Sequence, residues 1–385
     1  MVDIRTATPD DWPAMSFADA RAFGSSMSAD DREDMRTVIE FDRFRLAVED
    51  GQIVGLAGAW TLEMTLPGGA TVPTGGVTWV SVAVTHRRRG VMSALLGAVH
   101  EDIDAHGEPL AALNASEGGI YERFGYGIAT RRRTIAIDRH RAQLMPRLRP
   151  TGGTVRIVDP LAALPEIMDV WDRYRRRRAG EIGRPEVVFR LDVALNPHDV
   201  HVLHADGYAC WRFEQTVAGG LPELELTVVT MAAVTDEAHV ALWDTVLSTD
   251  LVGPIRSSTV PPDDPLPYLL ADQRAVRTTN VTDRIWCNVR DVAGCFDARA
   301  YGTDDDVVVE VDGVRWRLGA SGTRKVRTRP DLVTDRAGLG ALVLGGEAPT
   351  TLVAGRRMEA TTASALRRAD ALFVVHPAPY SQSGF

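Results

Sequence analysis

The sequence predicts an α+β fold in which mixed β-sheets are covered by helices, arranged as two similar domains followed by a smaller α/β domain. Three observations support this prediction. A chain of 385 residues is longer than one ordinary hydrophobic core requires. Three adjacent strands precede the first long amphipathic helix, which is typical of a mixed sheet and not of a doubly wound one. A similar order of hairpin, strand and helix returns in the middle of the chain.

The first domain is expected over residues 1–149. Its expected elements are, in order, a strand at 2–5, a helix capped by residues 8–11, a hairpin of strands 41–48 and 53–66 around the turn 49–52, a turn at 66–69 and a strand at 78–85. Residues 145–153 are rich in proline and glycine, which stop both helices and strands, so they are expected to form a linker.

The segment 79–126 organises this domain. An apolar run at 79–84 predicts a buried strand, and the basic turn 86–90 follows it. After this turn, apolar residues recur at helical spacing, at Val91, Met92, Leu95, Leu96, Val99 and Ile103. Gly107 ends the helix, and a strand at 110–113 leads to a short helix that carries Tyr121. Unpaired N–H groups and the helix dipole make the start of the first helix a site for anions.

The composition excludes several classes of protein. Apolar residues make up 45% and charged residues 25% of the chain, as in soluble globular proteins. The net charge of −9 argues against a nucleic-acid partner. We find neither a secretory signal pattern nor a run of 18 apolar residues, so no membrane partner is expected. Cys210, Cys287 and Cys295 lack metal-ligand spacing, which indicates a reduced cytoplasmic protein with no metal.

The second domain is expected over residues 150–285. Its elements are a hairpin of strands 200–203 and 208–214, a strand at 224–234 and a helix at 236–247. Asp236 and Glu237 stand where the first domain has arginines, and such a junction would repel a pyrophosphate. We therefore interpret this domain as a degenerate copy without a cofactor site. The arginine run 175–178 is open to three interpretations: a solvated helix face, an oligomer contact, or a site for RNA or another anion.

The third domain is expected over residues 286–385. Strands are expected at 286–290 and 372–375, a hairpin of strands 305–311 and 314–318 around Asp312 and Gly313, and helices at 292–299 and 362–368. The last ten residues are irregular in pattern, and a dangling tail is the default expectation for such an end.

The basic turn is not specific by itself, because arginine-rich turns are often solvated clusters. It lacks the Gly-Lys-Ser/Thr ending of a Walker loop, and no Rossmann fingerprint is present. Its surroundings are more informative. A hydrophobic strand precedes it, the next strand ends at Asn114, and Tyr121 follows. This arrangement suits a ligand with a pyrophosphate at one end and a reactive, extended arm at the other.

These residues resemble the acyl-CoA-binding core of the GNAT N-acetyltransferases. Residues 87–92, RRRGVM, match the motif Arg/Gln-x-x-Gly-x-Gly/Ala, with Met92 in place of the small residue, and residues 120–126, IYERFGY, match the end of the core. The fuller pattern, THRRRGVMSALL with NASEGGIYERFGYG, resembles the Eis (enhanced intracellular survival) subfamily. That resemblance spans the whole chain and implies an active GNAT domain, a degenerate GNAT domain and a domain like sterol carrier protein.

The resemblance also implies roles for individual residues. Tyr121 is the expected general acid, which protonates the departing thiolate, while Tyr126 is expected to pack. The carboxylate of the terminal residue, Phe385, is the expected base, although Gly384 stands where the subfamily has an acid. The residues expected to bind acetyl-CoA are Val80, Ser81, Val82, Arg87, Arg88, Arg89, Gly90, Val91, Met92, Ser93, Asn114, Ser116 and Glu117.

The expected activity is direct transfer of acetyl from acetyl-CoA to primary amines of a small molecule or peptide. The resemblance implies aminoglycoside or lysine-like acceptors, acetylation at several positions, and assembly as a hexamer. Acidic residues in the first helical region either line an amine pocket or form a solvated face: Asp30, Asp31, Glu33 and Asp34. The alternative function is a non-catalytic acyl-CoA or lipid-binding protein.

Overall fold

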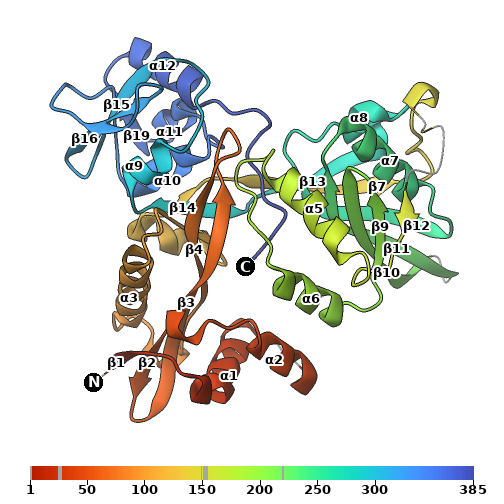
Figure 1. Cartoon of the computed structure of the whole chain (residues 1–385), viewed down its shortest axis with the longest axis horizontal. Helices are drawn as coiled ribbons and strands as arrows, with labels where there is room; N and C mark the ends of the chain where they lie inside the picture. The colour runs from red at the N-terminus through yellow and green to blue at the C-terminus, as the bar shows by residue number, and fades with distance from the viewer. Residues whose placement is uncertain (1, 25–27, 149, 151–154, 219–220) are drawn as a thin grey trace.

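The computed structural model describes residues 2–24, 28–148, 150, 155–218 and 221–385. Figure 1 shows three lobes: the N-terminal lobe at lower left, the central lobe at right and the C-terminal lobe at upper left. Each lobe contains one β-sheet with helices packed on it. The predicted class, mixed α/β sheets in three units, is confirmed.

The sheet of the N-terminal lobe has seven strands in the order β1-β2-β3-β4-β5-β14-β6. β4 and β5 run parallel and the other neighbours antiparallel, so the predicted mixed sheet is confirmed. The strands are β1 (Asp3–Thr6), β2 (Phe44–Glu49), β3 (Gln52–Thr65), β4 (Thr71–Val82), β5 (Leu110–Asn114), β14 (Ile285–Val289) and β6 (Gly127–Ile128).

Helices cover both faces of this sheet. Met15 of α1 packs against Phe44 and Leu46, whereas Leu95 of α3 packs with Ala47 on the opposite face, because side chains alternate along a strand. The Thr8 capping box with Asp11 is present, as the sequence predicted. The helices of this lobe are η1 (Pro9–Asp11), α1 (Trp12–Phe23), α2 (Ala29–Arg36), η2 (Phe41–Arg43), η3 (Val84–His86), α3 (Val91–Ala105), α4 (Gly118–Tyr121) and η4 (Glu122–Phe124).

The sheet of the central lobe has the order β13-β7-β12-β11-β10-β9-β8. Its strands are β13 (Val276–Asp283), β7 (Arg131–Asp138), β12 (Val252–Val260), β11 (Leu221–Ala233), β10 (Gly207–Ala218), β9 (Val200–His204) and β8 (Arg156–Ile157). Its helices are η5 (Pro146–Leu148), α5 (Leu164–Arg175), α6 (Glu186–Leu195), α7 (Asp236–Leu247), α8 (Leu266–Leu269) and η6 (Gln273–Ala275). The predicted hairpin and the helix at 236–247 are confirmed. The predicted linker 145–153 lies partly outside the described residues.

Two strands do not follow chain order. β7 comes from the first 149 residues but pairs with β12 and β13 in the central sheet. β14 is the strand expected at the start of the third domain, yet it lies in the first sheet between β5 and β6. The neighbouring lobes are therefore joined by strands as well as by surface contacts, while the boundaries at 149 and 285 stay predictions.

The C-terminal sheet has the order β17-β16-β15-β18-β19. Its elements are α9 (Val292–Phe296), β15 (Asp306–Val311), β16 (Val314–Gly319), β17 (Arg324–Lys325), β18 (Leu332–Thr334), α10 (Arg336–Val343), α11 (Pro349–Ala354), β19 (Met358–Ala360) and α12 (Ala363–Phe373). The hairpin around Asp312 and Gly313 is confirmed. The strand expected at 372–375 is wrong, because Leu372 and Phe373 continue the buried face of α12 that Ala369 belongs to.

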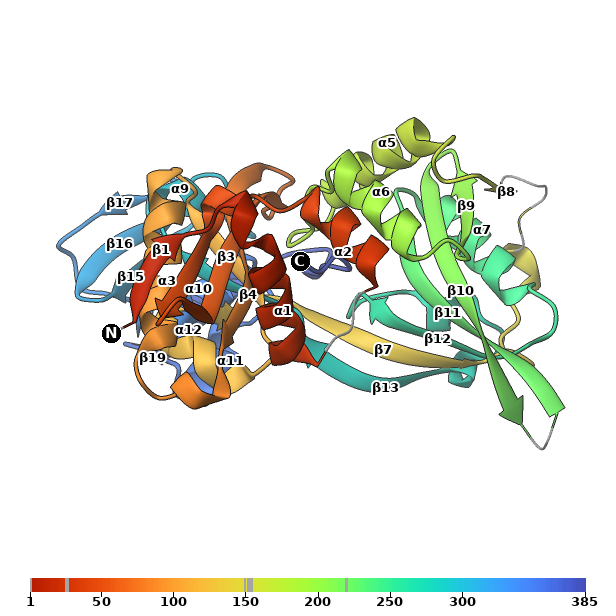
Figure 2. The ribbon, with the colours of Figure 1, turned by 90° about the horizontal axis from the view of Figure 1, so that it is seen from below.

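The dangling tail is also wrong. Tyr380, Ser381 and Gln382 are 1%, 0% and 7% exposed. The carboxylate of Glu181 accepts hydrogen bonds from the Gln382 backbone N–H (3.1 Å) and from the Ser381 hydroxyl (3.3 Å). Figures 1 and 2 show the tail passing between the lobes, with the C-terminus between the first sheet and α6. The tail is thus part of the core between lobes.

The arginine run 175–178 binds the lobes together. Arg175 is 6% exposed and pairs with Glu63 of β3 at 2.7 Å. Arg178 pairs with Asp263 at 2.6 Å and donates to the Ala378 carbonyl of the tail at 2.9 Å. A solvated helix face is therefore the wrong interpretation for these two arginines, because their charges are matched inside the chain.

Candidate active site

A β-bulge in β4 lies at the centre of the candidate site. Leu56 of β3 pairs with Ser81 and Gly58 pairs with Thr78, so Ala57 alone faces both Trp79 and Val80. Trp79 has a φ of 52°, a strained value for a residue other than glycine. Such a bulge interrupts the ladder and redirects the backbone groups beside it.

β4 and β5 separate just beyond the point where they pair. Their parallel register extends from Thr74 to Gly76 on β4. The backbone of residues 77–82 therefore has no partner on β5, while the end of β5 continues to pair with β14 on its other side. This edge offers N–H and C=O groups to an extended ligand, as β-strand addition requires.

The turn before α3 supplies the anion end of the site. Gly90 is the N-cap of α3 and has a φ of 79°, which favours glycine. A Cβ placed at Gly90 would meet nothing within 4 Å, so the space over the turn is open. The first amides of α3 have no intrahelical partner, and Arg87 and Arg88 stand beside them. This geometry is compatible with the predicted cradle for a diphosphate, which stays a prediction.

A pocket of about 710 Å³ connects the edge of β4 with this turn. It contains twelve of the residues that the sequence analysis proposed: Val80, Ser81, Val82, Arg87, Arg88, Gly90, Val91, Met92, Ser93, Ser116, Glu117 and Tyr121. Five further residues line the pocket and were missed by the sequence analysis: Ala22, Phe23, His86, Ile120 and Arg123. Phe23 ends α1 with half of its surface exposed, and no local motif marks it as part of a site.

Two of the residues proposed to bind acetyl-CoA, Arg89 and Asn114, are not in the pocket lining. The Arg89 guanidinium pairs with Glu49 at 2.7 Å, and His86 contacts the same carboxylate at 2.8 Å. The side-chain amide of Asn114 is buried, and neither its oxygen nor its nitrogen has a hydrogen-bond partner in the described protein. A buried amide without partners at the opening between β4 and β5 fits a polar ligand group there.

Tyr121 and Tyr126 differ in their surroundings. Tyr121 lines the pocket, is 5% exposed, and its pKa is raised by burial while the Ser116 hydroxyl bonds to it. Tyr126 is fully buried, contacts His100 at 2.9 Å and meets the Tyr121 ring edge-on at 6.2 Å. This geometry supports Tyr121 as the reacting phenol and Tyr126 as packing, and both roles stay predictions.

A second cleft, of about 600 Å³, lies on the other side of the bulge. Trp79 lines this cleft, whereas its neighbour Val80 lines the first pocket. Residues of the N-terminal lobe, the central lobe and the C-terminal tail, including Phe385, line the second cleft together. The contributions of the central lobe, among them Trp171 and Arg184, were missed because no pattern in the sequence marks them.

The acidic region of α2 does not line either cavity. The lining of the second cleft begins at Met35, and Asp31 is used in a capping box with Ser28. The structure agrees with a solvated acidic face.

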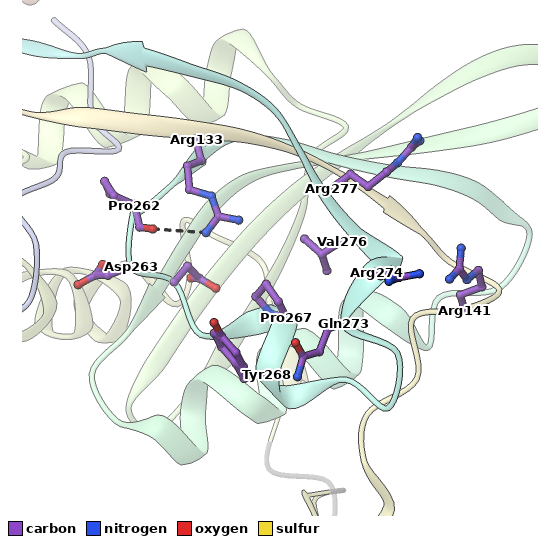
Figure 3. Close-up of a pocket in the computed structure, with 11 residues that line it drawn as sticks. Arg133, Arg141, Pro262, Asp263, Pro267, Tyr268, Gln273, Arg274, Val276 and Arg277 are labelled. Carbon is purple, nitrogen blue, oxygen red and sulfur yellow. Dashed lines mark hydrogen bonds between the residues drawn. The ribbon is translucent and has the colours of Figure 1, made fainter.

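Another hollow, shown in Figure 3, lies on the central lobe and has a volume of about 820 Å³. Arg133 donates to the Pro262 carbonyl, and Arg141 pairs with Asp272. In Figure 3 the side chains of Arg133, Arg274 and Arg277 point in different directions. These arginines do not converge on one anion, so this hollow lacks the features of the pocket before α3.

The bulged and splayed strands, followed by an arginine-rich turn at the start of a helix, define the fold of a GNAT acetyltransferase. Two family models described as acetyltransferase (GNAT) domain match residues 3–129 and 171–290, and a sterol carrier protein domain matches residues 292–382. The central GNAT domain has Asp236 and Glu237 in the first turn of its α7.

Named relatives indicate which kind of GNAT acetyltransferase the chain resembles. The chain is 35% identical to the N-acetyltransferase Eis of Mycobacterium tuberculosis strain H37Ra, spanning 97% of this chain and 96% of the relative. It is also 35% identical to an uncharacterized N-acetyltransferase of Streptomyces avermitilis, over 100% and 99% of the two chains. The crystal structure of Eis1 from Mycobacterium abscessus superposes with a TM-score of 0.90 at 32% identity over the whole of both chains.

The chain therefore belongs to the Eis family of N-acetyltransferases and is an acetyltransferase. GNAT acetyltransferases use acetyl-CoA, and their reaction implies an amine-bearing substrate. In the part of the chain that the structure describes, no group of three or more His, Cys, Asp or Glu side chains is placed to hold a metal ion. Among the same residues, every helix is too short or too polar to cross a membrane.

Proposed function

We propose that the chain transfers acetyl directly from acetyl-CoA, bound in the pocket before α3, to a primary amine bound in the second cleft. The bulge at Trp79 and Val80 carries this proposal, because its two residues line the two cavities. A thioester that enters along β4 and an amine that enters from the other side would meet at this bulge. Holding two reactants together in this way removes much of the entropic barrier to their reaction.

The pocket residues have matching roles in this proposal. The backbone of residues 80–82 pairs with the pantetheine arm and polarises the thioester carbonyl. The amides that open α3, with Arg87 and Arg88, bind the diphosphate. Asn114 bonds to the arm where β4 and β5 separate. Arg89, which pairs with Glu49, would act by shaping the turn.

In this proposal, two groups of this chain account for the protons that move during the reaction. The amine nitrogen attacks the thioester carbonyl carbon, a C–N bond forms, and the C–S bond breaks as the tetrahedral intermediate collapses. The Phe385 carboxylate removes the proton that the amine loses. Tyr121 gives its proton to the leaving thiolate. In this scheme the buried tail serves to hold the Phe385 carboxylate at the reacting centre.

The finer expectations stay predictions. They are aminoglycoside or lysine-like acceptors, acetylation at several positions, a hexamer, and a cytoplasmic location.

The alternative, a non-catalytic acyl-CoA or lipid-binding protein, shares the pocket but needs no phenol inside it. The position of Tyr121 in the lining favours turnover over binding alone.

The decisive experiment measures CoA release from acetyl-CoA with and without a panel of primary amines. We expect release to depend on the amine and to fall about 10²–10⁴-fold in Tyr121→Phe, with little change in the KM for acetyl-CoA. Tyr126→Phe is the matched control and should stay within a few-fold of wild type. Release without amine, or full activity in Tyr121→Phe, would contradict the proposal.

The role of the terminal carboxylate has its own test. Two residues, Gly-Ser, are appended after Phe385, which moves the carboxylate away while the tail contacts remain. We expect kcat to fall at neutral pH and to recover partly at higher pH, where more amine is already deprotonated. Unchanged kcat in the extended chain would remove Phe385 from the mechanism.

A further inference from the structure

The central lobe repeats the separation of strands that opens the edge of β4. β11, α7 and β12 follow one another in the order of β4, α3 and β5, and β11 and β12 run parallel. Their register ends at Val228 and Ser257, while β12 continues to pair with β7 as far as Val260. In the part of the chain that the structure describes, residues 229–233 of β11 therefore have no backbone partner on β12.

A β-bulge precedes the open edge in both lobes. Val228 and Thr230 of β11 pair with adjacent residues of β10, so Val229 is the extra residue. The bulge of β4, at residues 79–80, is followed by the backbone that lines the pocket before α3. Because a bulge redirects the backbone groups beside it, the equivalent groups of β11 are also turned out of the ladder.

In the central lobe the tail of the chain occupies this edge. The Met231 N–H donates to Oε1 of Gln382 at 3.1 Å, and Nε2 of Gln382 donates to the Met231 carbonyl at 3.5 Å. One side-chain amide thus satisfies both the donor and the acceptor of a strand residue, as an added strand or the amide of an extended ligand would. The Val229 carbonyl accepts a hydrogen bond from the Thr259 hydroxyl at 3.0 Å.

The helix that follows β11 does not suit a diphosphate. The first turn of α7 carries Asp236 and Glu237, and the Thr235 hydroxyl accepts a hydrogen bond from the Ala238 N–H at 3.2 Å. Carboxylates in this position repel phosphate groups. The edge of β11 therefore has the backbone pattern of a site for an extended arm without the anion site that acyl-CoA requires.

We infer that the central GNAT domain is the docking site of the tail, and that Gln382, whose amide takes the place of a ligand arm on β11, is a positioning residue for the terminal carboxylate. Gln382 is 7% exposed, and its N–H also donates to Glu181 at 3.1 Å. Phe385 follows three positions later and lines the second cleft. A residue held by its main chain and its side chain so close to the end of the chain limits the freedom of the carboxylate.

This inference rests on the proposed function, in which the terminal carboxylate accepts the proton of the amine. The test removes the amide of Gln382 and then returns it in solution. Gln382→Ala lacks one CH2–CONH2 group, which acetamide closely replaces. With saturating acetyl-CoA and the primary amine that wild type acetylates fastest, we expect kcat of the variant to fall about tenfold and the KM for acetyl-CoA to stay unchanged. Acetamide should raise kcat of the variant at least about threefold, whereas dimethylacetamide, which has no N–H, should not.

Gln382→Met is the matched variant, because methionine keeps the length of the side chain without its amide. It should lose kcat as Gln382→Ala does, but acetamide should not restore it, since the space is filled. Gln273→Ala, at an exposed glutamine of η6, should leave kcat within about twofold of wild type. Wild-type kcat in Gln382→Met, or an equal response of both Gln382 variants to acetamide, would overturn the inference.

A second measurement does not depend on turnover. Selective 15N labelling of methionine lets NMR follow hydrogen exchange at the Met231 N–H. We expect this N–H to exchange at least about tenfold faster in Gln382→Ala than in wild type, because its partner is gone. The N–H of Met64, a fully buried residue of β3, is the control and should be unchanged. Equal exchange at Met231 in the two chains would overturn the docking of the tail on β11.

The inference and the proposed function fail separately. If wild type shows no amine-dependent CoA release, the proposed function ends, while faster exchange at Met231 in Gln382→Ala still supports the docking of the tail. Faster exchange together with wild-type kcat would overturn the positioning role of Gln382 and leave the acetylation of amines intact.

Discussion

At the scale of single residues, the site depends on a few backbone conformations that ordinary side chains avoid. Gly90 adopts a φ of 79° at the point where the turn becomes α3. Trp79 adopts a φ of 52° and packs its ring near Phe44 and Trp12, at 5.6 and 6.0 Å. These contacts offset the strain of the bulge. The bulge in turn places Trp79 in the lining of one cavity and Val80 in the lining of the other.

Gly90→Ala tests the anion turn. The added methyl group meets open space, so the effect comes from the backbone alone. We expect a loss of about 1 kcal/mol in the free energy of unfolding, and a higher KM for acetyl-CoA because the turn shifts. Gly97→Ala, at an exposed position inside α3, is the control and should raise stability by about 0.5–1 kcal/mol without changing that KM. Equal effects of the two variants would contradict this account, and urea unfolding with steady-state kinetics would reveal them.

At the scale of elements, the tail is held by one buried carboxyl group. Glu181 is fully buried, and burial raises its pKa to about 7, although the Gln382 N–H and Arg178 favour its charged form. Tyr174 and Ser381 also donate to it. The docking of the tail, and with it the position of Phe385, is therefore coupled to the protonation of Glu181.

The sign of this coupling can be predicted. The folded chain keeps a proton on Glu181 up to about pH 7, whereas the unfolded chain releases it near the ordinary value of 4.5. The stability linked to this proton is complete below about pH 4.5 and is lost as the pH rises through 7. Between pH 5 and 8, wild type should lose on the order of 3 kcal/mol relative to Glu181→Gln.

Chemical unfolding at several pH values measures this difference. Glu359→Gln, at an exposed position of β19, is the control and should leave the profile parallel to that of wild type. A wild-type curve parallel to that of Glu181→Gln across the whole range would show that Glu181 does not titrate in this window.

At the scale of the whole molecule, the lobes share strands, buried surface and ion pairs. β14 fills the first sheet between β5 and β6, and its Trp286 belongs to the core beneath α3. The core of the C-terminal lobe continues into the first sheet through Leu110 and Ala112 of β5 and Cys287 of β14. The second cleft exists only because residues of the N-terminal lobe, the central lobe and the C-terminal tail meet.

A fragment of residues 1–149 should therefore fail to fold as the first domain does in the whole chain. Without β14, the edge of β5 and part of the core below α3 are open, and an open apolar edge promotes aggregation. We expect no cooperative unfolding of the fragment and no binding of acetyl-CoA. Coexpression with residues 150–385 should restore both, and a fragment that unfolds cooperatively and binds acetyl-CoA alone would contradict this view.

Much of the pocket before α3 could be predicted from sequence because its signals are local. The helical spacing from Val91 to Ile103, the arginines before Gly90, and the distance from Asn114 to Tyr121 all lie within one short segment. Turn chemistry and periodicity act over a few residues, so a linear pattern records them. The hairpins around residues 49–52 and Asp312 were predicted for the same reason.

The second cleft, the burial of the tail and the places of β7 and β14 were decided by the tertiary structure alone. Glu181 and Gln382 are 201 positions apart, and Arg175 and Glu63 are 112 apart. Contacts at such separations depend on how sheets and lobes pack, and no local periodicity encodes them. The sequence by itself thus determined the turn, the helix start and the phenol that line the pocket before α3, because these signals are local. Only the packing of the lobes and the tail decided which residues line the second cleft on the other side of the bulge, because these residues are far apart in the sequence.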